Sequence, residues 1–163
     1  MALAAGFIAT MAGGPTQAAD ACDVLTARVI RATGASLAGR AGTGAVFRAA
    51  DAERMSLACR APRRIVLGSL AREPDRRFFA LIGAAAHALT GARAEEVEGL
   101  ALNLHQDSLL TGMPHEGIAG RAAPRCETGP RADDLAGSLT VCLVTSVEPL
   151  RRRAGLFVNR PAG

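Results

Sequence analysis

The sequence contains no lysine, no tyrosine and no tryptophan, so every one of its 19 basic residues is an arginine. Tyrosine and tryptophan are the usual stacking platforms for bases and sugars, and five phenylalanines are the only aromatic residues here. Their absence argues against binding of nucleic acids or carbohydrates. Alanine, glycine and arginine are abundant instead, which is typical of the product of a GC-rich coding sequence.

Motifs that carry catalysis are also missing. No G-x-S-x-G sequence marks a nucleophile, and no two cysteines have the C-x-x-C spacing of zinc ribbons and thioredoxin-like sites. The glycine-rich segment 42–47 leads into an expected strand, so it lacks the helix N-terminus that a phosphate loop needs. Ser108, His105 and Asp107 are neighbours only along the chain, whereas the members of a catalytic triad meet in space. We therefore expect no enzymatic activity, and no motif identifies a family.

The length and charge of the chain set broad limits. A chain of 163 residues is long enough to form one domain with a core of its own. The formal net charge of +4 favours anionic partners, although the charge is spread along the sequence.

Residues 1–18 have the features of a signal peptide. They contain no charged side chain, Ala2–Ala12 is apolar, and residues 16–18 (T-Q-A) offer small side chains at the positions that signal peptidase reads. Because no positive charge lies near the first residue, a start further upstream and a simple apolar tail are the alternatives. The run is too short to span a membrane, and we expect no other transmembrane segment. This pattern predicts a periplasmic or secreted protein.

Four cysteines fit an exported protein. In an oxidising compartment four cysteines form two disulfides, for which three pairings are possible. We favour Cys22 with Cys59 and Cys126 with Cys142, because each pairing links neighbouring elements of the chain. Four reduced thiols in a cytosolic protein are the alternative.

The stretch 54–70 predicts the central hairpin of an antiparallel sheet. Met55, Leu57 and Cys59 alternate with polar or small side chains, and this period of two gives a strand one buried face. A turn and a second strand with apolar residues on both faces follow.

Capping residues and periodicity predict the remaining elements. The pattern is clearest for a helix that begins at Asp75 and ends before Gly91. Residues 94–104 combine features of a helix and a strand, and Gly99 favours a strand over 98–105. The other expected elements are a helix from Asp20 to Gly34 with Cys22, Leu25, Val29 and Ala32 on its apolar face, a mobile connection over 35–44, strands over 45–49, 118–126 and 138–147, and loops over 106–116 and 127–134.

These elements predict an α+β domain over residues 19–150, in the order α-β-β-β-α-β-β-β. The simplest arrangement is one antiparallel sheet of about five or six strands with two helices packed on one face. The arginine-rich tail, residues 151–163, lies outside this domain and either adds a last edge strand or is disordered.

Metal-capable side chains are concentrated in one region, where His105 and Asp107 precede a loop that ends at His115 and Glu116. If this loop folds back on itself, the nitrogen and oxygen atoms of these four side chains could bind a divalent cation. Polar residues are also usual in a solvated connection, which is the alternative. His87 falls opposite the apolar face of its helix, so we expect it to be exposed.

Arginines gather at the ends of the expected hairpin and in the first turn of the following helix. They are Arg60, Arg63, Arg64, Arg76 and Arg77. If several of them share one edge of the fold, they form a surface for carboxylates, phosphates or an acidic protein. An ordinary solvated surface, with arginine in place of lysine, is the alternative.

The sequence therefore predicts a small exported protein, stabilised by disulfides, that binds another protein or an anionic ligand and catalyses no reaction. The second hypothesis is a periplasmic metal-binding protein that uses the loop over residues 105–116. A metal ion in that loop is the only cofactor that the sequence raises.

Overall fold

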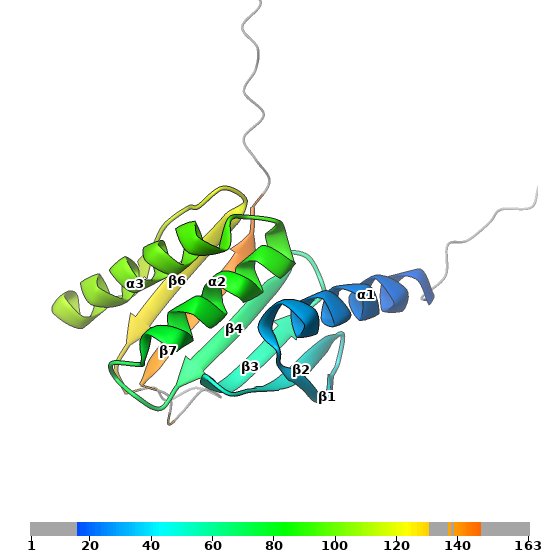
Figure 1. Cartoon of the computed structure of the whole chain (residues 1–163), viewed down its shortest axis with the longest axis horizontal. Helices are drawn as coiled ribbons and strands as arrows, with labels where there is room; N and C mark the ends of the chain where they lie inside the picture. The colour runs from blue at the N-terminus through cyan, green and yellow to red at the C-terminus, as the bar shows by residue number, and fades with distance from the viewer. Residues whose placement is uncertain (1–15, 131–136, 138, 148–163) are drawn as a thin grey trace, which may run out of the picture.

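The computed structural model describes residues 16–130, 137 and 139–147, with side chains from residue 21 onward. These residues form an α+β fold of two layers, in which seven strands make one antiparallel sheet and three helices pack on one of its faces (Figure 1). The predicted fold class is confirmed, with more strands and one more helix than the sequence led us to expect.

The order of the elements differs from the predicted order. The helices are α1 (Thr16–Thr33), α2 (Arg76–Thr90) and α3 (Ala94–Thr111). The strands are β1 (Ser36–Ala41), β2 (Gly44–Ala49), β3 (Ala52–Ala58), β4 (Arg64–Ser69), β5 (His115–Glu116), β6 (Ala122–Thr128) and β7 (Thr140–Ser146). Four strands follow α1 without interruption, and α2 and α3 then follow each other directly, so the chain does not consist of two similar halves.

Across the sheet the strands lie in the order β1-β2-β3-β4-β7-β6-β5. β1 to β4 form a meander of hairpins, after which the chain passes through the helical layer and returns at the opposite edge. β4 and β7 pair at the centre, where Ile65 lies opposite Val144. α1 covers the β1–β3 side, α2 the centre and α3 the β6 side (Figure 1).

The β3–β4 hairpin lies in the middle of the sheet, as predicted. Met55 and Leu57 of β3 and Ile65 and Leu67 of β4 point toward the helices and are at most 2 % exposed. Hydrophobic burial of this inward row joins the sheet to the helical layer in one core. The predicted strands over 45–49 and 138–147 are likewise present, as β2 and β7.

α2 begins and ends where its capping residues predict. The side chain of Asp75 accepts a hydrogen bond from the backbone N–H of Arg77 at 2.9 Å, which satisfies one of the free donors of the first turn. Gly91 follows the last turn with a φ of 77°, a left-handed conformation that glycine adopts without strain. The buried side chains include five apolar positions that recur at helical spacing along one face: Phe78, Leu81, Ile82, Ala85 and Leu89. His87 is exposed, as expected.

The predicted strand over 98–105 and the predicted loop over 106–116 are wrong, because α3 occupies most of both segments. The buried positions of α3 follow the helical period rather than the alternation of leucines. They are Val97, Ala101, Leu104, His105 and Ser108. Since this buried face consists largely of small and polar residues, its apolar pattern is weak in the sequence. Gly99 is exposed on the opposite face, where it causes no break.

The predicted mobile connection over 35–44 is also wrong, because β1 pairs with β2 in most of this segment. The register shifts between Leu37 and Gly39, which marks a bulge in the edge strand. Pairing with β2 satisfies the backbone groups of this glycine-rich segment, and composition alone does not reveal such a partner.

The remaining differences concern the ends of elements. α1 begins at Thr16 rather than at Asp20, and Ala32 is exposed instead of facing the core. The strand expected over 118–126 begins only at Ala122, and Ile118, which is 71 % exposed, lies in the connection between β5 and β6.

Several predictions fall outside the described residues. They concern the signal peptide before residue 16, the second half of the loop expected over 127–134, and the tail over 151–163. The first half of that loop is described, and there β6 continues to Thr128 instead of ending at residue 126. Among the residues that are described, no helix is long and apolar enough to cross a membrane.

Candidate functional site

The four side chains predicted as metal ligands do not meet. His105 is buried between α3 and the core, Asp107 and Glu116 are exposed, and His115 lies on the two-residue edge strand β5. Within the described residues, no group of three or more histidine, cysteine, aspartate or glutamate side chains is placed to hold a metal ion. The helix α3 turns His105 and Asp107 to different faces, and His115 and Glu116 lie beyond its end in β5.

His105 packs in the apolar core. It is 3 % exposed, its ring centroid lies 5.2 Å from that of Phe79, and its Nδ1 has no hydrogen-bond partner among the described residues. Burial lowers the pKa of His105 below its ordinary value of 6.5, and the charge of Glu73 opposes this effect only in part. The neutral imidazole therefore behaves as a core side chain with an unsatisfied nitrogen.

The hydroxyl groups near these histidines are occupied by structural hydrogen bonds. The buried Ser108 Oγ accepts a hydrogen bond from the backbone N–H of Thr128 at 2.9 Å and thereby fastens α3 to β6. Thr111 Oγ1 donates to the carbonyl oxygen of Asp107 at 2.8 Å and lies 2.7 Å from His115 Nε2 at the exposed end of α3. Ser108 and His105 thus do not form a nucleophile–base pair.

The five predicted surface arginines separate into two groups. Arg60, Arg63 and Arg64 lie at the start of β4, whereas Arg76 and Arg77 lie in the first turn of α2, beyond the other end of that strand (Figure 1). A six-residue strand spans about 20 Å, so the two groups cannot contact one small ligand. Arg76 is in addition paired with Glu98 at 3.2 Å.

The face of the sheet that points away from the helices is the most distinctive surface. In the described part of the chain all the helices lie on the opposite face (Figure 1). Directly paired positions form one row across this face: Val46, Ser56, Val66, Leu143, Arg125 and Glu116. The row is apolar at the centre of the sheet and charged toward the β5 edge.

Two hollows lie along this row. The first hollow lies between the β1–β2 hairpin and β7 and has a volume of about 470 Å³. Small residues such as Ala41, Gly44 and Ala58 line it. The second, of about 460 Å³, lies between the turn at Ile118 and β7. Arg125 and Leu143 line both hollows, so together these form one shallow groove, which we call the sheet groove.

The charged side chains that line the sheet groove are two arginines and two glutamates: Arg64, Arg125, Glu116 and Glu127. Arg64 is exposed in the first hollow, and Arg125 separates the two hollows. Arg125 Nη2 lies 3.7 Å from Glu127 Oε2, and Glu116 is directly opposite Arg125 in the neighbouring strand β5. The groove thus combines apolar side chains at its centre with charges of both signs, and its guanidinium groups can donate hydrogen bonds to carboxylates.

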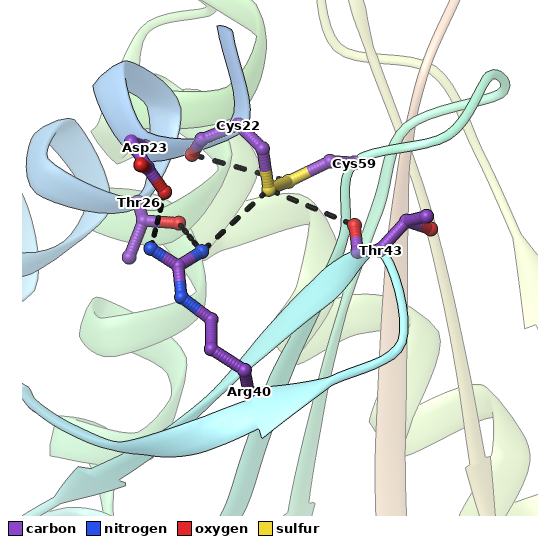
Figure 2. The surroundings of a disulfide bond; sticks show 6 residues. All are labelled: Cys22, Asp23, Thr26, Arg40, Thr43 and Cys59. Carbon is purple, nitrogen blue, oxygen red and sulfur yellow. Dashed lines mark hydrogen bonds and ion pairs between the residues drawn. A yellow bond between two sulfur atoms is a disulfide. The ribbon is translucent and has the colours of Figure 1, made fainter. Parts of the chain in front are cut away.

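The two disulfides have the pairing that we favoured from the order of the elements. Cys22 of α1 is bonded to Cys59 just after β3, and Cys126 of β6 is bonded to Cys142 of β7. Figure 2 shows that Arg40 of β1 reaches toward the first disulfide and toward Asp23 of α1. The Arg40–Asp23 ion pair and the disulfide together tie α1 to the edge of the sheet.

Sequence reasoning missed the sheet groove, although part of its signal was present. The sequence indicates apolar residues on both faces of the second hairpin strand, which includes Val66, but Leu143 and Arg125 come from strands paired through distant contacts. Only the pairing of β4 with β7 and of β7 with β6 brings them together. Comparison of the chain with protein-family models, with curated proteins and with solved structures finds no match.

Proposed function

We propose that this protein is an exported binding or accessory protein that uses the sheet groove to hold a segment of an acidic partner protein. The observation that carries the proposal is the groove itself, formed by two adjoining hollows on a sheet face that no described helix covers. It is the place where apolar side chains and cationic groups lie together.

The shape of the groove favours a protein segment over a small metabolite. Small-molecule sites are concave and enclose most of their ligand, whereas this hollow is open along the sheet. Exposed apolar residues rimmed by polar ones are typical of protein contact surfaces. Val66 and Leu143 are only half-buried on this uncovered face of the sheet, so a partner that binds there would bury more of their apolar surface.

The exposed guanidinium group of Arg64 in the first hollow favours an acidic side chain in that segment. Arg64 lies two residues from Val66 along β4, whereas Arg125 lies opposite Leu143 and close to Glu127. The chain as a whole carries a net charge of +4. Such complementarity increases the association rate and selects against basic partners. The partner segment we propose therefore alternates aspartate or glutamate with apolar residues.

In-cell photocrosslinking tests the binding surface. A photoreactive phenylalanine analogue in place of Ser56, which lines the groove, is expected to form an adduct with a protein segment of acidic and apolar composition. The same analogue in place of Leu110, which is 86 % exposed on α3, is the matched control and should give no such adduct. Equal adducts from both positions, or none from Ser56, would overturn the proposal.

A charge reversal separates the groove from the rest of the arginine-rich surface. Arg64→Glu should reduce the Ser56 adduct about tenfold, because a close charge pair contributes roughly 1.5 kcal/mol or more to association. Arg72→Glu makes the same change at the opposite end of β4 and should leave the adduct unchanged. A similar loss from both variants would mean that net charge, and not the groove, drives association.

Export is tested by the intact mass of the protein recovered from an exporting host. We expect a mass reduced by residues 1–18 and by the four hydrogens of two disulfides. A full-length and fully reduced protein would overturn the proposed location, because disulfides rarely persist in a reducing cytosol.

A further inference from the structure

The two disulfides differ in their access to solvent. Cys126 and Cys142 are both 0 % exposed, in the core between α3 and the sheet. Cys22 is 8 % exposed, and Cys59 is only partly buried at the end of β3. A dissolved thiol can therefore approach Cys59 in the folded protein, whereas the Cys126–Cys142 bond first requires β6, β7 and α3 to separate.

The two sulfur atoms of the exposed disulfide also differ in their surroundings. Arg40 Nη1 lies 3.9 Å from Cys22 Sγ and 3.5 Å from Thr26 Oγ1. Arg40 is held in this position by its ion pair with Asp23, and Figure 2 shows its guanidinium beside Cys22 rather than Cys59. A nearby guanidinium favours the thiolate form of a cysteine, so Cys22 is the better leaving group of the two.

A second polar group next to Cys22 can accept a hydrogen bond from its thiol. The carbonyl oxygen of Thr43, in the β1–β2 turn, lies 3.6 Å from Cys22 Sγ. It opposes a long-lived thiolate but can accept a hydrogen bond from the protonated thiol. Arg40 thus stabilises the sulfur while it leaves, and Thr43 stabilises it after it takes up a proton from water.

We propose that Cys59 is a site of thiol–disulfide exchange with small-molecule thiols. The attacking thiolate uses its electron pair to form a new bond to Cys59 Sγ, and the electron pair of the broken bond stays on Cys22 Sγ, which leaves as a thiolate. The product is a mixed disulfide on Cys59 and a reduced Cys22. A second small-molecule thiolate then attacks the small-molecule sulfur of the mixed disulfide. This step releases the oxidised dimer of the small thiol and leaves Cys59 as a reduced thiolate.

The exchange does not require the core to open. α1 remains packed through Leu25 and Val29, which are at most 4 % exposed, and the β1–β2 hairpin remains paired with β3. Breaking the bond therefore releases only the connection between α1 and the end of β3.

The test is to treat the full-length, oxidised, folded protein with reduced glutathione and to map the products by peptide mass spectrometry after alkylation. We expect a glutathione adduct on Cys59 and alkylation of Cys22, while Cys126 and Cys142 stay linked at thiol concentrations at least about tenfold higher. An adduct mainly on Cys22, or simultaneous opening of both disulfides, would overturn the proposal.

Arg40 is the positioning residue, and its role is measured by the rate of the exchange. Arg40→Gln should slow the release of Cys22 about threefold or more at neutral pH, because the leaving thiolate loses its cation. Arg40→Lys should restore most of the rate. Arg48→Gln, an equivalent change on the outer face of β2, is the matched control and should have no effect. Equal rates for Arg40→Gln and the parent protein at unchanged stability would remove Arg40 from the mechanism.

Discussion

At the scale of single residues, His105 has the least favourable environment in the described core. Its Nδ1 is buried without a hydrogen-bond partner, and burial lowers its pKa below 6.5. In the unfolded chain the same imidazole takes up a proton near its ordinary pKa. As the pH falls below that value, the unfolded state binds more protons than the folded state, so the free energy of unfolding decreases.

His105→Leu is expected to remove this pH dependence. The parent protein should lose stability between about pH 7.5 and about pH 5.5, on either side of the ordinary pKa of 6.5, while the variant loses less. Urea unfolding at both pH values measures the difference. His87→Gln is the control, since His87 is exposed, and it should retain the loss of the parent protein. A parent protein whose stability does not change over this range would contradict the prediction.

Asp75 is the second residue whose ionisation affects stability. Its hydrogen bond to the backbone N–H of Arg77, supported by the charge of the Arg77 side chain, lowers its pKa below 3.8. This contribution is complete above the pKa of the unfolded chain and disappears as the pH falls through the lower pKa of the folded state.

Asp75→Ala is therefore expected to lower the melting temperature at neutral pH, because α2 loses its N-cap. Asp75→Ser should retain most of the stability, since a serine hydroxyl also accepts the capping hydrogen bond. The difference between the parent protein and Asp75→Ala should shrink as the pH falls through the pKa of Asp75. Thermal unfolding followed by circular dichroism at neutral and acidic pH tests all three expectations, and equal melting temperatures at neutral pH would argue against the cap.

At the scale of the elements, the contact between α2 and α3 depends on one glycine. A Cβ atom at Gly83 would lie 2.5 Å from the carbonyl oxygen of Ala94 and 3.3 Å from Glu98 Cβ. The two helices approach closely only because this side chain is absent. Gly99, in α3, has no atom within 4 Å of the corresponding position.

Gly83→Ala should destabilise the protein by roughly 1 to 3 kcal/mol, because the helices must move apart. Gly99→Ala is the matched control and should stabilise it by about 0.5 to 1 kcal/mol, because alanine has the higher helix propensity. Chemical denaturation of both variants measures these values. Two substitutions of the same sign would show that the close approach of α2 and α3 does not determine the outcome.

At the scale of the whole molecule, the disulfides stabilise different parts of the fold. Cys22–Cys59 closes a sequence separation of 37 residues and ties α1 to the sheet edge, whereas Cys126–Cys142 closes 16 residues within the core. Chain entropy alone gives the longer loop the larger effect, about 4 kcal/mol against about 3 kcal/mol. The buried sulfurs, however, also fill space between α3 and the sheet.

We expect the double variant Cys126→Ala/Cys142→Ala to lose at least as much stability as Cys22→Ala/Cys59→Ala. The reason is that removal of buried atoms leaves a cavity, whose cost adds to the loss of the cross-link. Guanidinium unfolding of both double variants, prepared from an oxidising host, provides the comparison. A clearly larger loss from the Cys22/Cys59 variant would mean that loop length dominates.

The sequence by itself determined the elements whose signals are local. The β3–β4 hairpin and β7 follow from alternation and β-branched residues, and α2 follows from Asp75, its apolar spacing and Gly91. The order of these elements favoured the observed pairing of the cysteines among three possible pairings, and the structure decided it. In each case the physical cause, a periodic apolar face or a cap, lies within a few residues of the structure it produces.

The presence of α3, of β1 and of the sheet groove was established only by the tertiary structure. The buried face of α3 includes His105 and Ser108, and Ser108 acquires its partner only where β6 lies alongside. The edge strand β1 depends on pairing with β2, and the groove depends on which face of the sheet the helices leave uncovered. These features arise from contacts between distant segments, so the local sequence carries little of the information that specifies them.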